Sequence, residues 1–143
     1  MEIKKIMTTP VISVEAGYTL EMIEKIMTKA DIGHVTVRDE GKLVGIIADS
    51  DVKKFKSRLA GTEMSNRREE ETLKLRAHQI MTRDPYTVNE KDDISIGMEL
   101  LLEKKIHSLP VVNDKGSCTG ILTVSDLLKF FKNILEKRNQ PHS

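Results

Sequence analysis

An internal repeat constrains the fold of this 143-residue chain more than any other feature of its sequence. The tripeptide Ile6-Met7-Thr8 returns about 74 residues later as Ile80-Met81-Thr82, and residues 45–55 (GIIADSDVKKF) match residues 120–130 (GILTVSDLLKF). Ordered self-similarity of this kind indicates that one structural unit occurs twice. A unit of roughly 50 residues seldom buries enough apolar surface to be stable alone. We therefore expect two pseudo-symmetric copies that pack face to face into one module.

The hydrophobic pattern predicts the same order of elements in both copies. A short β-prone run, residues 9–14 or 85–88, precedes a helix whose expected N-cap is Thr19 or Asp93. Two strands joined by a turn follow in each copy, at residues 35–38 and 43–47 and at residues 109–112 and 118–122. A second helix is expected to begin at Ser50 or Ser125. The order strand-helix-strand-strand-helix, present twice, predicts an α/β fold.

The repeat and the polar stretch inside it also set the predicted domain boundaries. We expect the first copy over residues 1–60, a polar linker over residues 61–79, the second copy over residues 80–137 and a flexible tail over residues 138–143. The linker is rich in charged residues, which is typical of a solvated segment. The spacing of Glu70 and Lys74 favours some helix within it.

Apolar residues at helical spacing define the helix faces expected to turn inward. In the first helix of each copy these residues are Leu20, Ile23, Ile26, Met27 and Ala30, and Ile94, Met98, Leu101 and Leu102. The closing helix of the first copy has one apolar stripe, formed by Val52, Phe55 and Leu59. That of the second copy has two adjoining apolar faces, formed by Leu127, Leu128, Phe130, Phe131, Ile134 and Leu135. One face is enough for a core, so the surplus predicts a homodimer.

Composition and motifs argue against several classes of protein. The chain has 23 basic and 22 acidic residues, and 3% of its residues are aromatic with no Trp, which argues against binding of nucleic acid. The sequence contains one cysteine, Cys118, so a disulfide within the chain is excluded. Neither a membrane span nor a secretory signal is seen, so we expect a cytoplasmic protein. Phosphate-loop, dinucleotide and nucleophile-elbow motifs are missing, and neither an enzyme nor a metal site is predicted.

Two motifs in each copy resemble those of CBS domains, regulatory modules named after cystathionine β-synthase. The opening Met7-Thr8 or Met81-Thr82 lies shortly before a proline, and the closing motif is Gly-h-h-Thr-x-x-Asp-h, where h is apolar, as in residues 120–127. Residues 106–112 (IHSLPVV) resemble the middle strand of the family. The likeness extends over nearly the whole chain, so we expect a stand-alone tandem CBS pair. The resemblance implies an α/β fold in which the two repeats are packed through their sheets into one module. It also implies two related clefts between the sheets, which take AMP, ADP, ATP or S-adenosylmethionine.

The residue types near the second closing motif are compatible with such a ligand. Asp126, in the first turn of a helix, offers a carboxylate that can accept hydrogen bonds from the vicinal hydroxyls of a ribose. Thr123 and Ser125 offer hydroxyl groups, and the helix N-terminus suits a phosphate. The alternative interpretation is structural, because an acid at this position also stabilises a helix start and a serine also caps it.

By the resemblance, each cleft is composite and draws on both copies. The cleft around Asp126 would use Ile121, Thr123, Ser125 and His107 with Thr9, Ile12, Ile32 and His34, and the cleft around Asp51 would use Ile46, Asp51 and His34 with Thr87, Ile106 and Ser108. In the first copy Ala48 replaces the hydroxyl residue that Thr123 supplies, so we expect the Asp51 cleft to bind more weakly or to stay empty.

Two functions from different classes follow from this sequence. The first is a regulatory, energy-sensing module that binds an adenosine nucleotide as its ligand and signals to an unidentified partner protein, without any catalytic cofactor. The second is a scaffold that binds its partner constitutively through helical faces while the clefts stay empty.

Overall fold

The computed structural model of the protein describes residues 1–57 and 65–139, which form two compact units. The central unit spans Ile12–Pro85. The terminal unit combines Met1–Val11 with Tyr86–Ser143, so the first eleven residues belong with the second copy of the repeat. Each unit has its own sheet and its own hydrophobic core.

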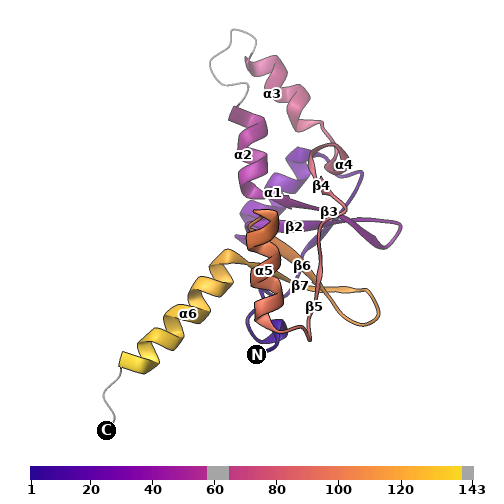
Figure 1. Ribbon diagram of the computed structural model, residues 1–143. Helices are drawn as coiled ribbons and strands as arrows, with labels where there is room; N and C mark the ends of the chain where they lie inside the picture. Colours follow the sequence, from indigo (N-terminus) through magenta and orange to yellow (C-terminus); the bar gives the residue numbers. More distant parts are fainter. Residues whose placement is uncertain (58–64, 140–143) are drawn as a thin grey trace. The chain divides into compact units, whose positions relative to one another are not determined.

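The central unit is a four-stranded sheet with helices (Figure 1). Its elements are β1 (Ser13–Glu15), α1 (Leu20–Ala30), β2 (His34–Asp39), β3 (Lys42–Ala48), α2 (Asp49–Ser57), α3 (Ser65–Leu73), α4 (Ala77–Ile80) and β4 (Thr82–Arg83). The strand order is β1-β2-β3-β4, with β1 parallel to β2 and the other pairs antiparallel. Leu20 and Ile23 of α1 pack with Val35 and Ile47 of the strands, and all four side chains are fully buried.

The terminal unit repeats this arrangement with three strands in its sheet. Its elements are the short 3-10 helix η1 (Ile3–Lys5), β5 (Val88–Asn89), α5 (Ile94–Lys104), β6 (Ser108–Val112), β7 (Cys118–Thr123) and α6 (Val124–Asn139). The order is β5-β6-β7, parallel and then antiparallel. Leu101 of α5 and Leu127 of α6 pack against Leu109 and Leu122 of the sheet.

The predicted order strand-helix-strand-strand-helix is confirmed in both copies, as β1-α1-β2-β3-α2 and β5-α5-β6-β7-α6. Both predicted N-caps of the first helices are confirmed: the Thr19 hydroxyl accepts a hydrogen bond from Met22 N, and the Asp93 carboxylate accepts one from Ser95 N. The chain therefore has the α/β fold expected from its periodicity.

Four local predictions were wrong. Ala30, expected on the inward face of α1, is exposed. The closing helices begin at Asp49 and Val124, one residue before Ser50 and Ser125, so these serines lie inside the first turn and are exposed. Leu102 was expected to face inward, but 76% of its surface is accessible. It directly follows Leu101, which is buried, and consecutive helical residues point about 100° apart.

The opening segment of each copy packs on the unit formed by the other copy. Ile3 is fully buried in the core of the terminal unit, and Thr8 forms a two-bond antiparallel bridge with Ile121 of β7. In the central unit, Ala77 and Ile80 are buried in the core, and β4 pairs with β3. The predicted boundaries at residues 60, 79 and 137 follow the repeat along the sequence and stay predictions. The compact units divide elsewhere because these apolar opening segments are exchanged.

The predicted linker contains more regular structure than its polarity suggests. Helix α3 begins at Ser65, and Arg67 and Glu71 lie 3.9 Å apart on its exposed surface, one turn from each other. Leu59, predicted as part of the first apolar stripe, lies outside the described residues. In the part of the chain that the structure describes, every helix is too short or too polar to cross a lipid bilayer.

Candidate functional site

The carboxylate of Asp126 lies in the first turn of α6, where strand β7 ends and the helix begins. Its Oδ2 accepts a hydrogen bond from Thr123 N at 2.9 Å, and Asp126 N donates to the Thr123 hydroxyl at 3.1 Å. This reciprocal pair is a capping box, which satisfies two backbone groups at the helix start. Asp126 is buried, with 9% of its surface accessible. The structural interpretation of Asp126 therefore holds, but the capping residue is Thr123 and not Ser125. Part of the carboxylate can still accept further bonds.

A second contact of this carboxylate comes from Thr8, which sequence reasoning did not assign to the site. The Thr8 hydroxyl donates to both oxygens of Asp126, at 2.8 Å to Oδ1 and 3.1 Å to Oδ2. The bridge between Thr8 and Ile121 brings Thr8 beside Asp126, although Thr8 and Asp126 are 118 positions apart in the sequence. The recurrence of Met-Thr in both copies was the available signal, but it indicated the repeat rather than the contact.

The corresponding acid of the central unit, Asp51, has a simpler environment. Its Oδ2 accepts a hydrogen bond from Ala48 N at 3.1 Å, but Ala48 has no hydroxyl to complete the reciprocal pair. Thr82 bridges Ile46 of β3 as Thr8 bridges Ile121. Among the described residues, however, Thr82 makes no hydrogen bond with Asp51. The two acids therefore occupy equivalent positions with unequal hydrogen-bond partners.

The remaining predicted site residues of the terminal unit lie on β6, β7 and their ends. Ile121 is buried, and Ser108 pairs with Thr123 across the two strands. His107 directly precedes β6, its side chain is exposed, and its carbonyl accepts a hydrogen bond from Val124 N. Ile106 packs partly buried against the core, whereas Thr9, Thr87 and Ser125 are exposed. Thr123, Ser108 and His107 are therefore held beside the start of α6.

In the central unit the predicted residues occupy the corresponding strands. His34 begins β2 and pairs with Ala48 of β3, and Ile46 is buried within β3. Ile12 and Ile32 are partly buried against the core. Each predicted cleft combines residues from both units, so its composition stays a prediction.

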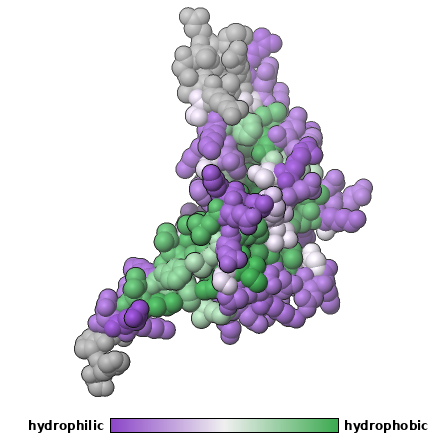
Figure 2. Space-filling model, viewed as in Figure 1, coloured by the Kyte–Doolittle hydropathy of each residue, from purple (hydrophilic) through white to green (hydrophobic). Residues whose placement is uncertain are grey.

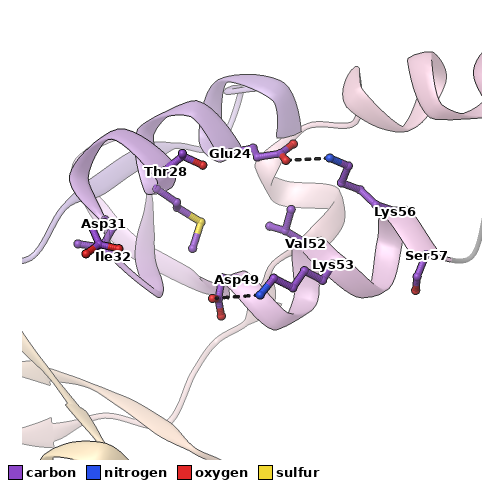
Figure 3. Close-up of a pocket in the computed structure, with 10 residues that line it drawn as sticks. Glu24, Thr28, Asp31, Ile32, Asp49, Val52, Lys53, Lys56 and Ser57 are labelled. Carbon is purple, nitrogen blue, oxygen red and sulfur yellow. Dashed lines mark hydrogen bonds and ion pairs between the residues drawn. The ribbon is translucent and has the colours of Figure 1, made fainter.

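A pocket of about 610 Å³ lies in the central unit between α1 and α2 (Figure 3). Met27 and Val52 contribute apolar surface, and two ion pairs lie on its walls, Lys56 with Glu24 at 2.8 Å and Lys53 with Asp49 at 3.9 Å. Ile32 also lines this pocket and is the one predicted site residue to do so. The pocket therefore shares one residue, Ile32, with the predicted set of ligand contacts.

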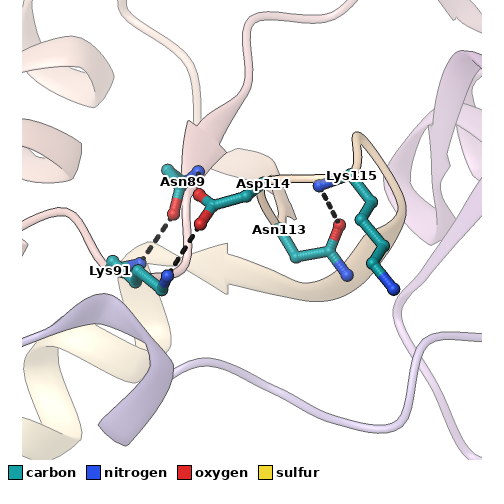
Figure 4. A network of polar contacts seen from close by, with 5 residues as sticks. All are labelled: Asn89, Lys91, Asn113, Asp114 and Lys115. Carbon is teal, nitrogen blue, oxygen red and sulfur yellow. Dashed lines mark hydrogen bonds and ion pairs between the residues drawn. The ribbon is translucent and has the colours of Figure 1, made fainter.

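Three side chains with a shifted pKa, Asp114, Lys91 and Asp93, lie away from the Asp126 site. A hydrogen bond from Lys91 Nζ at 2.7 Å, and a second from Asn89, lower the pKa of the Asp114 carboxyl, and the same carboxylate raises the pKa of Lys91 (Figure 4). The amino group of Met1, 2.8 Å from Asp93, together with Ser95, holds the pKa of the Asp93 carboxyl well below its usual range. The Lys91–Asp114 pair joins the turn after β5 to the turn between β6 and β7, and the Met1–Asp93 pair joins the start of the chain to the start of α5. Within residues 1–57 and 65–139, acidic, histidine and cysteine side chains form no group of three suited to a metal.

The CBS domain pattern matches residues 3–58 and residues 77–133. These two matches cover most of the chain, which therefore belongs to the CBS domain family. The predicted family is confirmed, and the two matched stretches correspond to the two copies of the repeat.

The chain is also similar to individual members of this family. Protein MJ1225 of Methanocaldococcus jannaschii is 33% identical over 125 residues, which are 87% of this chain and 45% of that protein. A CBS domain-containing protein of Dictyostelium discoideum is 29% identical over 94% of this chain and 93% of its own length. The solved CBS domain pair of protein MJ0100, in complex with 5′-methylthioadenosine and S-adenosyl-L-methionine, has a TM-score of 0.77 and 28% identity, covering 94% of this chain and 98% of that chain. The chain thus spans under half of the first relative and nearly all of the other two.

Proposed function

We propose that this chain is a regulatory module that binds an adenosine-containing small molecule, with Asp126 as the residue that binds the ribose. The observation that carries the proposal is the position of the Asp126 carboxylate, at the junction of β7 and α6 and beside the hydroxyls of Thr123 and Thr8. The binding of two adenosine compounds by the CBS pair of MJ0100 supports this class of ligand.

The chemistry of the Asp126 site fits a nucleoside. An ionised carboxylate only accepts hydrogen bonds, and the two vicinal hydroxyls of a ribose are donors about as far apart as its two oxygens. Helix α6, which begins at Val124, directs the partial positive charge of its N-terminus towards the same region, which favours a phosphate. His107, which directly precedes β6, contributes a nearby imidazole that can donate a hydrogen bond to a phosphate.

We carry the full predicted set of contacts into this proposal. The cleft of Asp126 takes Ile121, Thr123, Ser125 and His107 with Thr9, Ile12, Ile32 and His34, and the cleft of Asp51 takes Ile46 and His34 with Thr87, Ile106 and Ser108. The Asp51 cleft binds more weakly or stays empty, since Ala48 supplies no hydroxyl. Loss of one neutral hydrogen bond costs about 0.5–1.5 kcal/mol, which is roughly threefold to tenfold in affinity.

Calorimetric titration with AMP, ADP, ATP and S-adenosylmethionine tests the proposal. At least one compound is expected to bind, and Asp126→Asn is expected to weaken it by roughly 10- to 100-fold, the scale of a charged hydrogen bond. Asn keeps the shape of the side chain and an oxygen for Thr123 N, so the helix start is preserved. Asp51→Asn is the matched control and should change the tight site little. Equal affinity in wild type and Asp126→Asn would place the ribose elsewhere.

A scaffold function is the second candidate, because the terminal unit exposes a large apolar surface. On α6 and α5 the exposed side chains are Leu128, Phe131, Ile134, Leu135, Ile96 and Leu102. Figure 2 shows hydrophobic residues continuing along α6.

We propose that a second copy of the chain covers this surface in a symmetric homodimer, and that an unidentified partner protein reads the assembled module. Binding of such a partner without any nucleotide would favour the scaffold over the sensor.

A further inference from the structure

We infer that Thr8 is an internal competitor of the ligand, because its hydroxyl occupies the part of the Asp126 carboxylate that a ribose diol would use. This inference rests on the proposed function of Asp126. The Thr8 oxygen is 2.8 Å from Oδ1 and 3.1 Å from Oδ2, so one donor spans both acceptor atoms. A vicinal diol that donates one hydrogen bond to each oxygen would need the same position.

The acceptor capacity of Asp126 explains why the two cannot bind together. A carboxylate has about four acceptor positions, two facing inward between its oxygens and two facing outward. The Thr8 hydroxyl lies between the oxygens, and Thr123 N takes a further position on Oδ2. Only the outer side of Oδ1 is then open, which is enough for one ribose hydroxyl but not for both.

The structure also shows how Thr8 can give way. Its backbone is fixed to β7 by two hydrogen bonds, Thr8 N to Ile121 O at 2.8 Å and Ile121 N to Thr8 O at 3.0 Å. Thr8 is exposed to solvent, whereas Asp126 is buried. Rotation of the Thr8 side chain to another staggered rotamer therefore frees the carboxylate without detaching the opening segment. Binding then costs one hydroxyl-carboxylate bond and gains two.

The central unit provides a built-in comparison. Thr82 has the same position relative to β3 as Thr8 has to β7, but in the described part of the chain it makes no bond with Asp51. The competing contact is thus a property of the terminal unit alone among the described residues. Replacement of Thr82 is accordingly a matched control for replacement of Thr8.

The test compares Thr8→Val, Thr8→Ser and Thr82→Val with wild type in titrations with AMP and with its 2′,3′-dideoxy analogue. Thr8→Val, which removes the hydroxyl and keeps the shape, is expected to bind AMP roughly 3- to 10-fold more tightly. Its affinity for the dideoxy analogue should not change, because that analogue has no hydroxyls to compete with Thr8. Thr8→Ser and Thr82→Val should match wild type. Thermal unfolding without ligand checks that each variant is folded.

The outcomes separate this inference from the proposed function. If wild type binds AMP and Thr8→Val binds it equally or more weakly, Thr8 does not compete, and the inference is overturned while the proposed function stands. If wild type binds none of the adenosine compounds, the proposed function fails and the inference fails with it. Tighter binding of both AMP and the dideoxy analogue would also overturn it, because the gain would not depend on the ribose hydroxyls.

Discussion

The side chain of Met7 lies directly over Gly120 of β7, in the position that a Cβ atom on this glycine would occupy. Met81 lies over Gly45 of β3 in the same way, so the contact occurs once in each unit. Both methionines belong to the opening segments that are exchanged between the copies of the repeat. The two glycines are thus required by the close approach of these segments to the sheets.

We predict that Gly120→Ala destabilises the protein by about 1–3 kcal/mol, because the new methyl group displaces Met7 from a packed position. Met7→Ala should destabilise it as well, by loss of packing. In the double variant the added methyl group has room, so the two effects should not sum. Urea unfolding of the four proteins in this cycle measures the coupling, which we expect to exceed about 0.5 kcal/mol.

The matched cycle in the central unit uses Gly45→Ala and Met81→Ala, and should show coupling of the same sign. Additive effects in both cycles would contradict the proposed role of the glycines. They would indicate that the opening segments do not pack on these strands in solution.

A second prediction concerns the pH dependence of stability through Asp114 and Lys91. The pKa of Asp114 is lowered in the folded protein, so its contribution is present above the ordinary carboxyl pKa of about 4 and is lost as pH falls below it. The pKa of Lys91 is raised, so its contribution is present below the ordinary lysine pKa of about 10.4 and is lost as pH rises above it. The ion pair between Asp114 and Lys91 is the largest cause of both shifts.

Asp114→Asn should therefore flatten the pH dependence of the unfolding free energy in both ranges. Asp39→Asn, in the corresponding turn of the central unit, serves as the control, since Asp39 takes part in no ion pair within the described residues. Unfolding in urea at intervals from pH 3 to pH 11 provides the measurement. A variant whose pH profile superimposes on that of wild type would show that the pair contributes nothing measurable.

The third prediction concerns the exposed apolar surface of α6. If a second copy covers it, sedimentation at micromolar concentration should report about twice the chain mass of 16.2 kDa. Leu128→Glu places a charge on a side chain that is 65% exposed, so it should yield a folded monomer. Met22→Glu, at an exposed position on α1, should remain dimeric. A wild-type monomer at every concentration would contradict the homodimer.

Local sequence signals predicted the elements because they depend on neighbouring residues. Helical spacing located α1 and α5, and the turn residues at 39–42 and 113–116 located both hairpins. Thr19 and Asp93 were identified as caps because their bonds reach only two or three residues along the chain. The helix start at Val124 was missed because Thr123, and not Ser125, makes the cap. The start at Asp49 was missed because it follows Ala48, which has no capping side chain.

The site was predicted in part for the same reason. Asp126 and Thr123 are three residues apart, so their relation is visible in the sequence as a spacing. Thr8 lies 118 residues from Asp126, and nothing in its neighbourhood indicates this contact. The sequence shows that Ala48 replaces the residue corresponding to Thr123. It does not show that, among the described residues, Thr82 makes no hydrogen bond with Asp51.

The amino-acid sequence by itself determined the repeat, the family, the order of strands and helices in each copy and the acid at the start of each closing helix. These properties follow from periodicity and from short-range hydrogen bonds, which are encoded within a few residues. Only the tertiary structure decided that Met1–Val11 completes the terminal unit and that the Thr8 hydroxyl donates a hydrogen bond to the carboxylate of Asp126. The physical reason is that pairing between distant strands depends on how whole surfaces fit, which no local pattern records.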